Sequence, residues 1–423
     1  MQAIPPLPDF RSPAFLRGHV LQTLAFYDGR CIDPTGGFFH SYRDDGRVDD
    51  ERTRHLVGST RFVITFAMAA RAFPAHPRAS AWREAVAHGL HFLETAHRDP
   101  VHGGYHWLID WDGARATVRD GTKHCYGLAF VLLAYAQALR IGIHGAAAGL
   151  HATVELMEQR FWEPAAQRHA DEASADWTVS PYRGQNANMH ACEAMLAAFD
   201  ATGQAWFLAR AGAIAESITV GLAGQQPDGL VWEHYDASWR IDRDYHRDDP
   251  ANLFRPWGLQ TGHQTEWAKL LLALEARVPD AHTGLDRVGR AQRLFDLAWR
   301  AGWDEAHGGL VYGFIDGDDE RPGRYAVCDA HKYFWVQSES FAAAARLACR
   351  LPDAAARAQA WRRYDRLWDY AWSHFVDHRH GAWFRILTPD NRRLDDHKSP
   401  PGKTDYHTIG ACLDVLETLG DGA

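Results

Sequence analysis

A short motif recurs along the chain and limits the fold more than any other feature of the sequence. Each copy is a turn followed by a brief alternating apolar stretch, a pattern typical of one strand of a β-hairpin. Five copies are evident: Gly36-Gly37-Phe38-Phe39, Gly103-Gly104-Tyr105-His106-Trp107, Asp228-Gly229-Leu230-Val231-Trp232, Gly308-Gly309-Leu310-Val311-Tyr312 and Gly381-Ala382-Trp383-Phe384. The second and third copies start at residues 103 and 228, about twice the usual interval. We therefore expect a degenerate sixth copy midway, where residues 161–170 lie without glycine.

Helical segments flank each copy of this motif. Within residues 80–97, Trp82, Val86 and Leu90 recur at helical spacing, so one face of that helix is apolar. Residues 126–139 are apolar nearly all round, which is typical of a helix buried on every side. Each of the six repeats thus has an outer helix before its hairpin and an inner helix after it. Twelve such helices predict an all-α fold, an (α/α)6 barrel in one domain of residues 1–423. Because each hairpin joins an outer helix to an inner one, all inner helices should begin at the same end of the barrel.

Polar and aromatic side chains gather near the start of the expected inner helices. Spacings of three or four residues place pairs such as His263 and Glu266 on one helix face. The candidates come from all six repeats: Arg61; Tyr126; Asn186 and His190; His263 and Glu266; Trp335 and Glu339; Lys403 and His407. Each one alone has a structural explanation, for example a solvated pair or a hydrogen-bonded core histidine. Their joint occurrence on so many repeats favours a common site.

Several runs of these residues resemble the N-acylglucosamine 2-epimerase superfamily. The runs are Arg183-Gly184-Gln185-Asn186-Ala187-Asn188-Met189-His190, Glu233-His234-Tyr235-Asp236, the stretch 250–267 with Gly262-His263-Gln264-Thr265-Glu266-Trp267, Trp335-x-x-x-Glu339 and Asp405-Tyr406-His407. The resemblance covers residues 35–415 and is closest to the branch of aldose–ketose isomerases that act on mannose or sulfoquinovose. It implies an (α/α)6 barrel that interconverts free sugars at C1 and C2 without a nicotinamide.

The resemblance also implies roles for individual residues. His263 and His407 take the paired acid/base positions. The substrate-contact or ring-opening positions fall on His190, Arg61, Asn186, Glu266, Trp335 and Glu339. We further expect Tyr126 and Lys403 to contact the substrate.

The chemistry of isomerisation fits these residue types independently. A neutral imidazole is suited to take a proton from the carbon beside a carbonyl and to return it. Arg61 is a fixed cation for the oxygen on which charge develops. Glu266, one turn from His263, is expected to orient that imidazole. The sequence thus predicts a mannose–fructose type isomerase that works through an enediolate, on a monosaccharide, with no cofactor and no metal.

Four alternatives stay open at this stage. A sugar 2-epimerase would also use two histidines, on opposite faces of C2. A glycoside hydrolase would use two carboxylates about 5–9.5 Å apart, with Glu266 and Glu339 as candidates. A metal-dependent isomerase would use the same His and Glu side chains as ligands. A non-catalytic interaction role is the fourth alternative, because one relative in this superfamily is named as a renin-binding protein.

Composition excludes several classes of function. The chain has 45 basic and 54 acidic residues, a formal net charge of −9, so it lacks the basic excess of a nucleic-acid-binding protein. We expect no membrane segment, because no apolar run approaches about 18 residues. Six scattered cysteines and no secretory signal predict a reduced, cytoplasmic protein, and the sequence leaves open whether it is a monomer or a homo-oligomer. The longest irregular stretch, residues 235–262, is a candidate lid or a solvated insertion.

Overall fold

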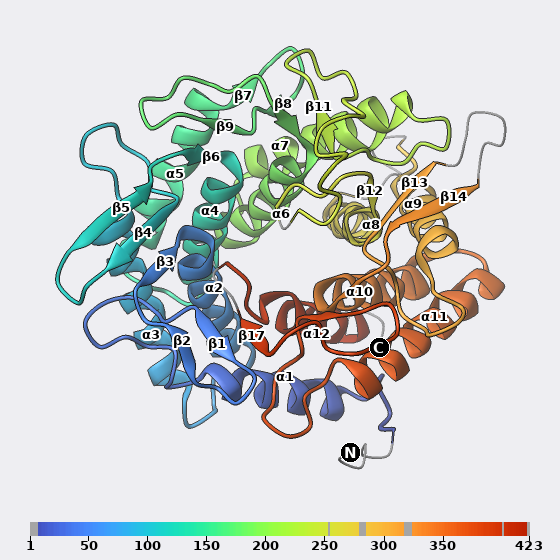
Figure 1. The fold of residues 1–423 in the computed structure, drawn as a ribbon, viewed down its shortest axis with the longest axis horizontal. Helices are drawn as coiled ribbons and strands as arrows, with labels where there is room; N and C mark the ends of the chain where they lie inside the picture. Colours follow the sequence, from blue (N-terminus) through green and yellow to red (C-terminus); the bar gives the residue numbers. More distant parts are fainter. Residues whose placement is uncertain (1–6, 253, 279–284, 317–323, 400–401, 421–423) are drawn as a thin grey trace.

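The computed structural model describes residues 7–252, 254–278, 285–316, 324–399 and 402–420, and these form two concentric rings of helices (Figure 1). The outer helices are α1 (Pro13–Tyr27), α3 (Ala79–Phe92), α5 (Ala146–Arg160), α7 (Ala205–Glu216), α9 (Arg287–Gly302) and α11 (Ala354–His374). The inner helices are α2 (Leu56–Ala72), α4 (Cys125–Arg140), α6 (Gln185–Thr202), α8 (Thr261–Arg277), α10 (Phe334–Arg350) and α12 (Tyr406–Gly420). Neighbouring inner helices pack together, and α12 packs on α2, which closes the ring. The predicted (α/α)6 barrel is confirmed.

The burial pattern explains which helices lie inside. In α3, Trp82, Val86 and Leu90 are buried and Arg83 and Glu84 are exposed, as the helical spacing predicts. In the inner helix α2, every residue from Leu56 to Ala70 is buried. A helix that is apolar on one face covers the barrel, whereas a helix that is apolar all round needs neighbours on both sides.

Short antiparallel strands connect each outer helix to the next inner one. In chain order they are β1 (Ser41–Arg43), β2 (Val48–Asp50), β3 (Thr53–His55), β4 (Leu108–Trp111), β5 (Ala116–Asp120), β6 (Lys123–His124), β7 (Trp162–Glu163), β8 (Arg168–His169), β9 (Glu172–Ala173), β10 (Arg183–Gly184), β11 (His234–Tyr235), β12 (Leu259–Gln260), β13 (Gly313–Asp316), β14 (Tyr325–Asp329), β15 (Lys332–Tyr333), β16 (Ile386–Leu387) and β17 (His397–Ser399). Several pair with strands of the next repeat, for example β10 with β11, β12 with β13 and β15 with β16. These pairings link successive repeats at the end of the barrel where the inner helices begin.

The degenerate repeat folds like the others. Trp162 pairs with His169, and Glu163 pairs with Arg168, so β7 and β8 form the expected hairpin. Gln167 in its turn has φ of 56°, in the left-handed region where most other copies place glycine. The turn geometry is thus retained although the glycine is absent.

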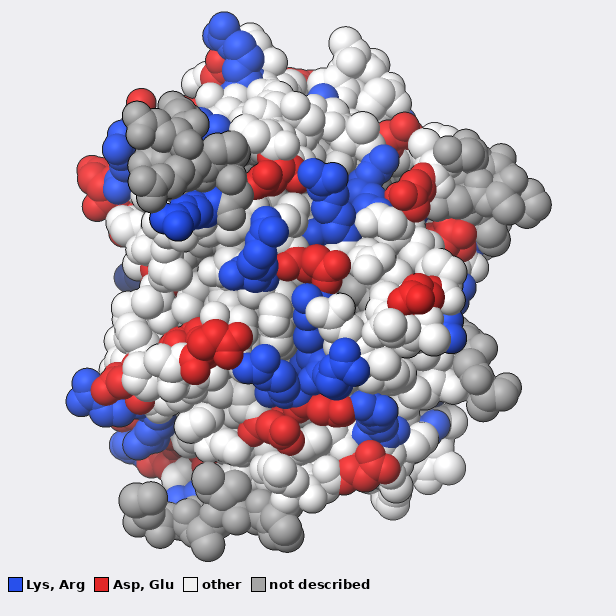
Figure 2. Space-filling view, turned by 90° about the vertical axis from the view of Figure 1, so that its right-hand side faces the viewer, with Lys and Arg blue, Asp and Glu red and all other residues white. Residues whose placement is uncertain are grey.

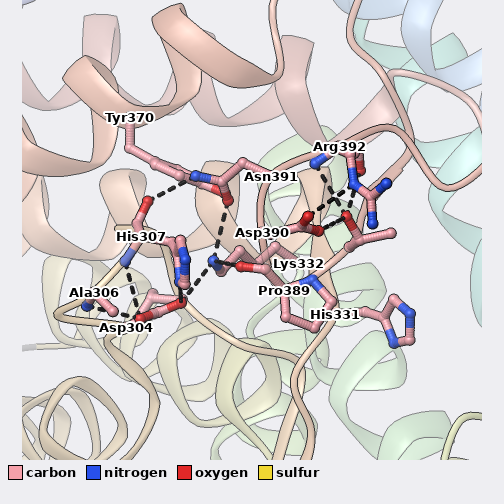
Figure 3. Close-up of polar contacts among 12 residues, drawn as sticks. Asp304, Ala306, His307, His331, Lys332, Tyr370, Pro389, Asp390, Asn391 and Arg392 are labelled. Carbon is pink, nitrogen blue, oxygen red and sulfur yellow. Dashed lines mark hydrogen bonds and ion pairs between the residues drawn. The ribbon is translucent and has the colours of Figure 1, made fainter.

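An acid–base pair anchors most of the hairpins to the inner ring. In the repeat drawn in Figure 3, Asp304 accepts the backbone N–H groups of Ala306 and His307, and Lys332 Nζ donates to the same side chain at 2.8 Å. Equivalent pairs are Arg54–Asp33, Lys123–Asp99, Arg183–Glu163 and Lys398–Asp377. In four of these five pairs the buried base lies two residues before the inner helix, and the fifth base, Lys398, lies in β17. The acid lies at the start of the hairpin turn. Each pair therefore fixes the turn relative to the first residues of the inner helix.

The fourth repeat departs from this pattern. Gln226 occupies the acid position, and Leu259 stands where four of the others carry the base, two residues before the inner helix. Gln226 accepts instead from Arg243, at 2.9 Å, in the irregular segment between β11 and β12. The structure confirms that this segment is long and irregular, and it supplies its own anchor.

We expected no segment long and apolar enough to cross a membrane, and this expectation is wrong when length and composition alone are considered. Within the described residues, one continuous helical run, Ala205–Gln225, meets that criterion. The run is continuous because α7 passes directly into the π-helix η2 (Ser217–Leu222) and the 3₁₀-helix η3 (Ala223–Gln225). Half of it is buried inside the barrel, and core helices of soluble proteins meet the same criterion.

Basic and acidic side chains are interspersed on the face of the molecule shown in Figure 2, which lies on the right-hand side of Figure 1. Ion pairs such as Arg363–Asp296 and Arg366–Glu305 join neighbouring outer segments. This face carries no continuous patch of one charge.

Candidate active site

One cavity of about 380 Å³ lies where the six inner helices begin, and we call it the front cavity. It is lined by Arg61, Tyr126, Asn186, His190, Phe254, Pro256, His263, Glu266, Tyr312, Trp335, Lys403 and His407. Nine of the ten sequence-predicted site residues are thus brought together here. The tenth, Glu339, lies behind His407 and hydrogen-bonds to it.

Two partners fix the ring of His407. Arg61 donates an N–H to Nε2 at 3.2 Å, which leaves Nδ1 to carry the proton of the neutral ring. Nδ1 then donates to Glu339 Oε1 at 2.7 Å. Burial and the nearby Arg61 charge lower the pKa of His407 well below its ordinary value. His407 is therefore a neutral imidazole whose Nε2 lone pair accepts from Arg61 at the edge of the cavity, where a substrate can take the place of that N–H.

The partner of His263 is Glu233 rather than Glu266. Glu233 Oε2 lies 2.9 Å from His263 Nδ1 and also accepts a hydrogen bond from the Gln185 amide. Trp267 donates to the oxygen of that amide, which fixes its orientation. The expectation that Glu266 orients His263 is therefore wrong. Glu266 is one turn along α8, whereas Glu233 reaches the ring because β11 pairs with the strand before α6.

His190 completes a set of three histidine–carboxylate pairs. Its Nδ1 lies 2.9 Å from Glu193 Oε2, one turn further along α6. The other oxygen of Glu193 accepts from the Tyr406 hydroxyl. Burial lowers the pKa of His190, and Glu193 opposes that change. All three candidate histidines thus contact a carboxylate through Nδ1, which orients the ring and leaves Nε2 for other contacts.

Arg61 is buried among neutral groups. It donates to the Gly402 carbonyl at 2.7 Å and to the Tyr126 hydroxyl at 3.3 Å, and it lies 4.6 Å from the centre of the Phe130 ring. A buried arginine needs partners, and here uncharged groups and His407 supply them. No carboxylate among the described residues hydrogen-bonds to it, so its positive charge is available to the cavity.

Four buried polar atoms of residues that line the front cavity lack a hydrogen-bond partner within the described part of the chain. They are Arg61 Nε, Glu266 Oε2, Asn186 Oδ1 and the Trp335 indole nitrogen. Buried polar atoms normally find partners, so these four fit the hydroxyl groups of a bound sugar. Burial, together with the neighbouring Glu339, raises the pKa of Glu266 well above its ordinary value. Glu266 is therefore a neutral acid, and its carboxyl O–H can donate a hydrogen bond.

Trp335 and Lys403 shape the rest of the cavity. The centre of a Trp335 ring lies 5.2 Å from that of His263 and 5.6 Å from that of His407, so the indole lies near both imidazoles. Burial, with Arg61 nearby, lowers the pKa of Lys403 to about 7. Phe254 and Pro256, from the irregular segment before β12, also line the cavity.

Two groups of side chains at this site have the composition of a metal site. The ligand atoms of His190, Glu193 and Glu266 lie within 4.8 Å of one another, as do those of Glu266, Glu339 and His407. The Nδ1 atoms of both histidines already contact carboxylates within these groups. The absence of a metal requirement stays a prediction.

Comparison with known proteins places the chain in a family. The sequence model of N-acylglucosamine 2-epimerase (GlcNAc 2-epimerase) matches residues 37–411. The chain belongs to the N-acylglucosamine 2-epimerase family. Among curated members of this family, D-mannose isomerase of Marinomonas mediterranea is 49% identical over 97% of this chain and 99% of its own length. D-mannose isomerase of Pseudomonas cannabina pv. alisalensis is 34% identical over 86% of this chain and 85% of its own.

Solved structures agree with the family assignment. A crystal structure of a D-mannose isomerase has 48% sequence identity and a TM-score of 0.89, and the match covers 97% of this chain and all of that one. Cellobiose 2-epimerase from Bacillus thermoamylovorans, at 18% identity, has a TM-score of 0.79 over 96% of this chain and all of that one, and shows the fold alone. The family resemblance predicted from the sequence is confirmed.

Sequence reasoning missed the carboxylates behind two of the histidines. Glu233 stood in a run that carried the family resemblance, but it was given no role there. Glu193 is three residues after His190, and the same spacing rule that paired His263 with Glu266 would have found it. Gln185 and Phe254 also stood in runs that carried the resemblance, but they were given no role, because their places depend on tertiary contacts.

Proposed function

We propose that the protein is an aldose–ketose isomerase that interconverts D-mannose and D-fructose. The observation that carries this proposal is the arrangement of two imidazoles, His263 and His407, beside one indole, with Nδ1 of each ring held by a buried carboxylate. Arg61 supplies a fixed positive charge in the same cavity. The extensive identity to D-mannose isomerases supports mannose as the aldose.

The geometry accounts for each step of the reaction. His190 opens the sugar ring by moving a proton between the anomeric hydroxyl and the ring oxygen. His407, held neutral by burial and Arg61, takes the proton from C2 through Nε2. Arg61 stabilises the negative charge on the enediolate oxygen. His407 then returns the proton to C1, while His263 passes a proton between the oxygens on C1 and C2.

A sugar 2-epimerase on the same scaffold is the second candidate, and the presence of epimerases in this family favours it over the others. An epimerase returns the proton to the opposite face of C2 instead of to C1. The two outcomes are separated by incubating the enzyme with D-mannose and following the products by proton NMR. We expect D-fructose as the early main product, whereas glucose accumulating first without fructose would establish the epimerase.

The remaining sequence predictions concern partners and location. We propose a free monosaccharide as the only partner needed for turnover, with no metal. We also propose a cytoplasmic location, with turnover the same for a monomer or a homo-oligomer. Dialysis against a chelator followed by the mannose assay tests the metal, and unchanged turnover is the expected result.

A further inference from the structure

A second cavity lies at the opposite end of the barrel, and we call it the rear cavity. Its volume is about 830 Å³, and later turns of all six inner helices line it. The charged or polar lining residues are Arg71, Gln137, Arg140, Glu193, Asp200, Lys269, Arg277, Glu339, Arg346, Tyr406, Asp414 and Glu417. The cavity opens to solvent, because the side chain of Glu417 at its rim is 49% exposed.

A thin polar layer separates the rear cavity from the front cavity. Glu193 and Glu339 line the rear cavity. Each also contacts a histidine of the front cavity: Glu193 through Oε2 contacts His190, and Glu339 through Oε1 contacts His407. Glu266 lies close to both carboxylates, because its oxygen is within 4.8 Å of ligand atoms in each group. Three acidic side chains from α6, α8 and α10 thus meet between the two cavities.

Lys269 is the cation nearest these three acids. It lies on α8, three residues after Glu266, and Nζ donates to Glu339 Oε2, the oxygen not used by His407. Its side chain is only 12% exposed. Although burial opposes its charge, the carboxylates of Glu339 and Glu193 raise the pKa of Lys269.

The arginines of the rear cavity are engaged elsewhere. Arg71 pairs with Glu417 and Arg277 pairs with Asp200, both at the outer rim. Arg346 pairs with Asp414. Within the described residues, Lys269 is thus the only Lys or Arg that hydrogen-bonds a carboxylate in contact with one of the three candidate histidines.

We propose that Lys269 is a positioning residue for the isomerisation: it keeps Glu339 ionised, so that His407 holds its proton on Nδ1 and presents Nε2 to the sugar. The rear cavity is the route by which a small cation from solvent can replace the ammonium group. This inference rests on the proposed function, because it assigns Lys269 to the reaction that His407 performs.

The charge balance explains the expected effect. Burial raises the pKa of Glu339, and the hydrogen bond and charge of Lys269 oppose that rise. Without Lys269, Glu339 takes up a proton and can no longer stabilise the imidazolium that forms when His407 takes the substrate proton. Lys269 does not line the front cavity, so sugar binding should be unaffected.

The test compares Lys269→Met with Lys269→Ala and with Arg277→Met, a matched control that removes a cation from the same cavity. Loss of an outer partner that orients a working histidine costs about 10- to 100-fold in metal sites, and we expect a fall in kcat of that size for both Lys269 variants. KM for mannose should stay within about twofold, because the substitutions remove no contact with the bound sugar in its ground state. Arg277→Met should retain wild-type kcat, because Arg277 contacts Asp200 and not Glu339.

Chemical rescue gives a readout that a purely structural role would not produce. Methylammonium chloride should restore kcat of Lys269→Ala without competing with mannose, whereas sodium chloride should not. Adding Gly410→Leu should block the rescue, since a side chain at Gly410 meets only the tip of Met68 and would project into the rear cavity. Folded Lys269 variants with wild-type kcat, a change in KM alone, or no rescue by methylammonium would overturn the proposal.

A second measurement separates this inference from the proposed function. The ¹⁵N resonances of His407 report its tautomer without any substrate. We expect the Nδ1-protonated form in the wild type and its loss in Lys269→Met. If the wild type fails to convert mannose but the tautomer still changes, the proposed function is wrong and Lys269 remains a positioning residue. An unchanged tautomer would refute the role of Lys269 whatever the substrate.

Discussion

Glu233 and His263 are thirty residues apart in the chain, yet Glu233 Oε2 lies 2.9 Å from His263 Nδ1. The two residues do not lie on the same helix, because Glu233 precedes β11 and His263 belongs to α8. Pairing of Gly184 with His234 brings the segment before β11 against the start of α6, and the first residue of that helix, Gln185, lies beside both groups. The orientation of one working histidine is thus set by strand pairing between two repeats.

Replacing either acid/base histidine should abolish most of the turnover. We expect His263→Ala and His407→Ala each to lower kcat by at least the ~10²-fold typical of a positioned acid or base. Circular dichroism should show an unchanged helix content, because both side chains face the front cavity. A variant that keeps near-wild-type turnover would move that histidine to a binding or packing role.

The two acids near His263 should respond differently to amide substitution. Glu233→Gln removes the negative charge beside the imidazole, so kcat should fall while KM stays nearly constant. Glu266→Gln replaces a neutral acid by a neutral amide that still donates a hydrogen bond, so it should keep more activity than Glu266→Ala. Steady-state kinetics with mannose measure all three. Equal losses for the two Glu266 variants would show that an ionised carboxylate is needed there.

Removing the Arg61 charge should move the pH dependence of the reaction. After burial, Arg61 is the largest cause that lowers the pKa of His407. His407 must be neutral to act as a base, so activity is lost as pH falls through its pKa. In Arg61→Met that pKa rises, and the acid limb of kcat/KM should move to higher pH. Arg61→Lys keeps the charge and should leave the limb in place, even where kcat falls. Profiles over about pH 5 to 9 distinguish the two variants.

Stability should decrease on acidification because buried histidines resist protonation. Burial lowers the pKa of His19 to about 3, and its Nε2 accepts the indole N–H of Trp383 at 2.8 Å. Between its unfolded and folded pKa values, the unfolded chain binds a proton that the folded chain does not. This loss begins as pH falls below the unfolded value. His19→Gln should therefore lose about 1.4 kcal/mol less than the wild type between about pH 7.5 and 5.5, as measured by urea unfolding. The exposed His151→Gln should leave the difference unchanged.

The degenerate hairpin offers a stabilising substitution. Gln167 is exposed and has φ of 56°, a conformation that costs an ordinary residue energy but not glycine. We expect Gln167→Gly to raise the free energy of unfolding by about 0.5–1 kcal/mol. Ala382 also has a positive φ, but its side chain is buried. Ala382→Gly therefore loses about 0.8 kcal/mol of methyl burial, which offsets the relief of backbone strain and leaves little net change in the free energy of unfolding. Urea denaturation of both variants checks this contrast.

The sequence predicted the barrel and the place of the site because both follow from local patterns. Turn residues and helical spacing identify hairpins and helices, and the order of elements then puts Arg61, His190 and His407 at one end. Contacts such as Glu233–His263 could not be predicted in this way, since they depend on how neighbouring repeats pair. The rear cavity was missed for a related reason: Lys269 continues the spacing of His263 and Glu266, but nothing local shows that Glu339 lies opposite.

The missing anchor in the fourth repeat has a consequence for how substrate preference can change. Five repeats hold their turns through an ion pair with a buried base, whereas the segment between β11 and β12 is held by its own Arg243 on Gln226. The segment also reaches the third repeat, because Trp239 donates to Glu163 and Arg255 pairs with Asp171 and Glu172. The side chains of Phe254 and Pro256, which it contributes to the front cavity, take no part in these polar contacts. These two positions are therefore where new sugar selectivity can evolve at the least cost to folding.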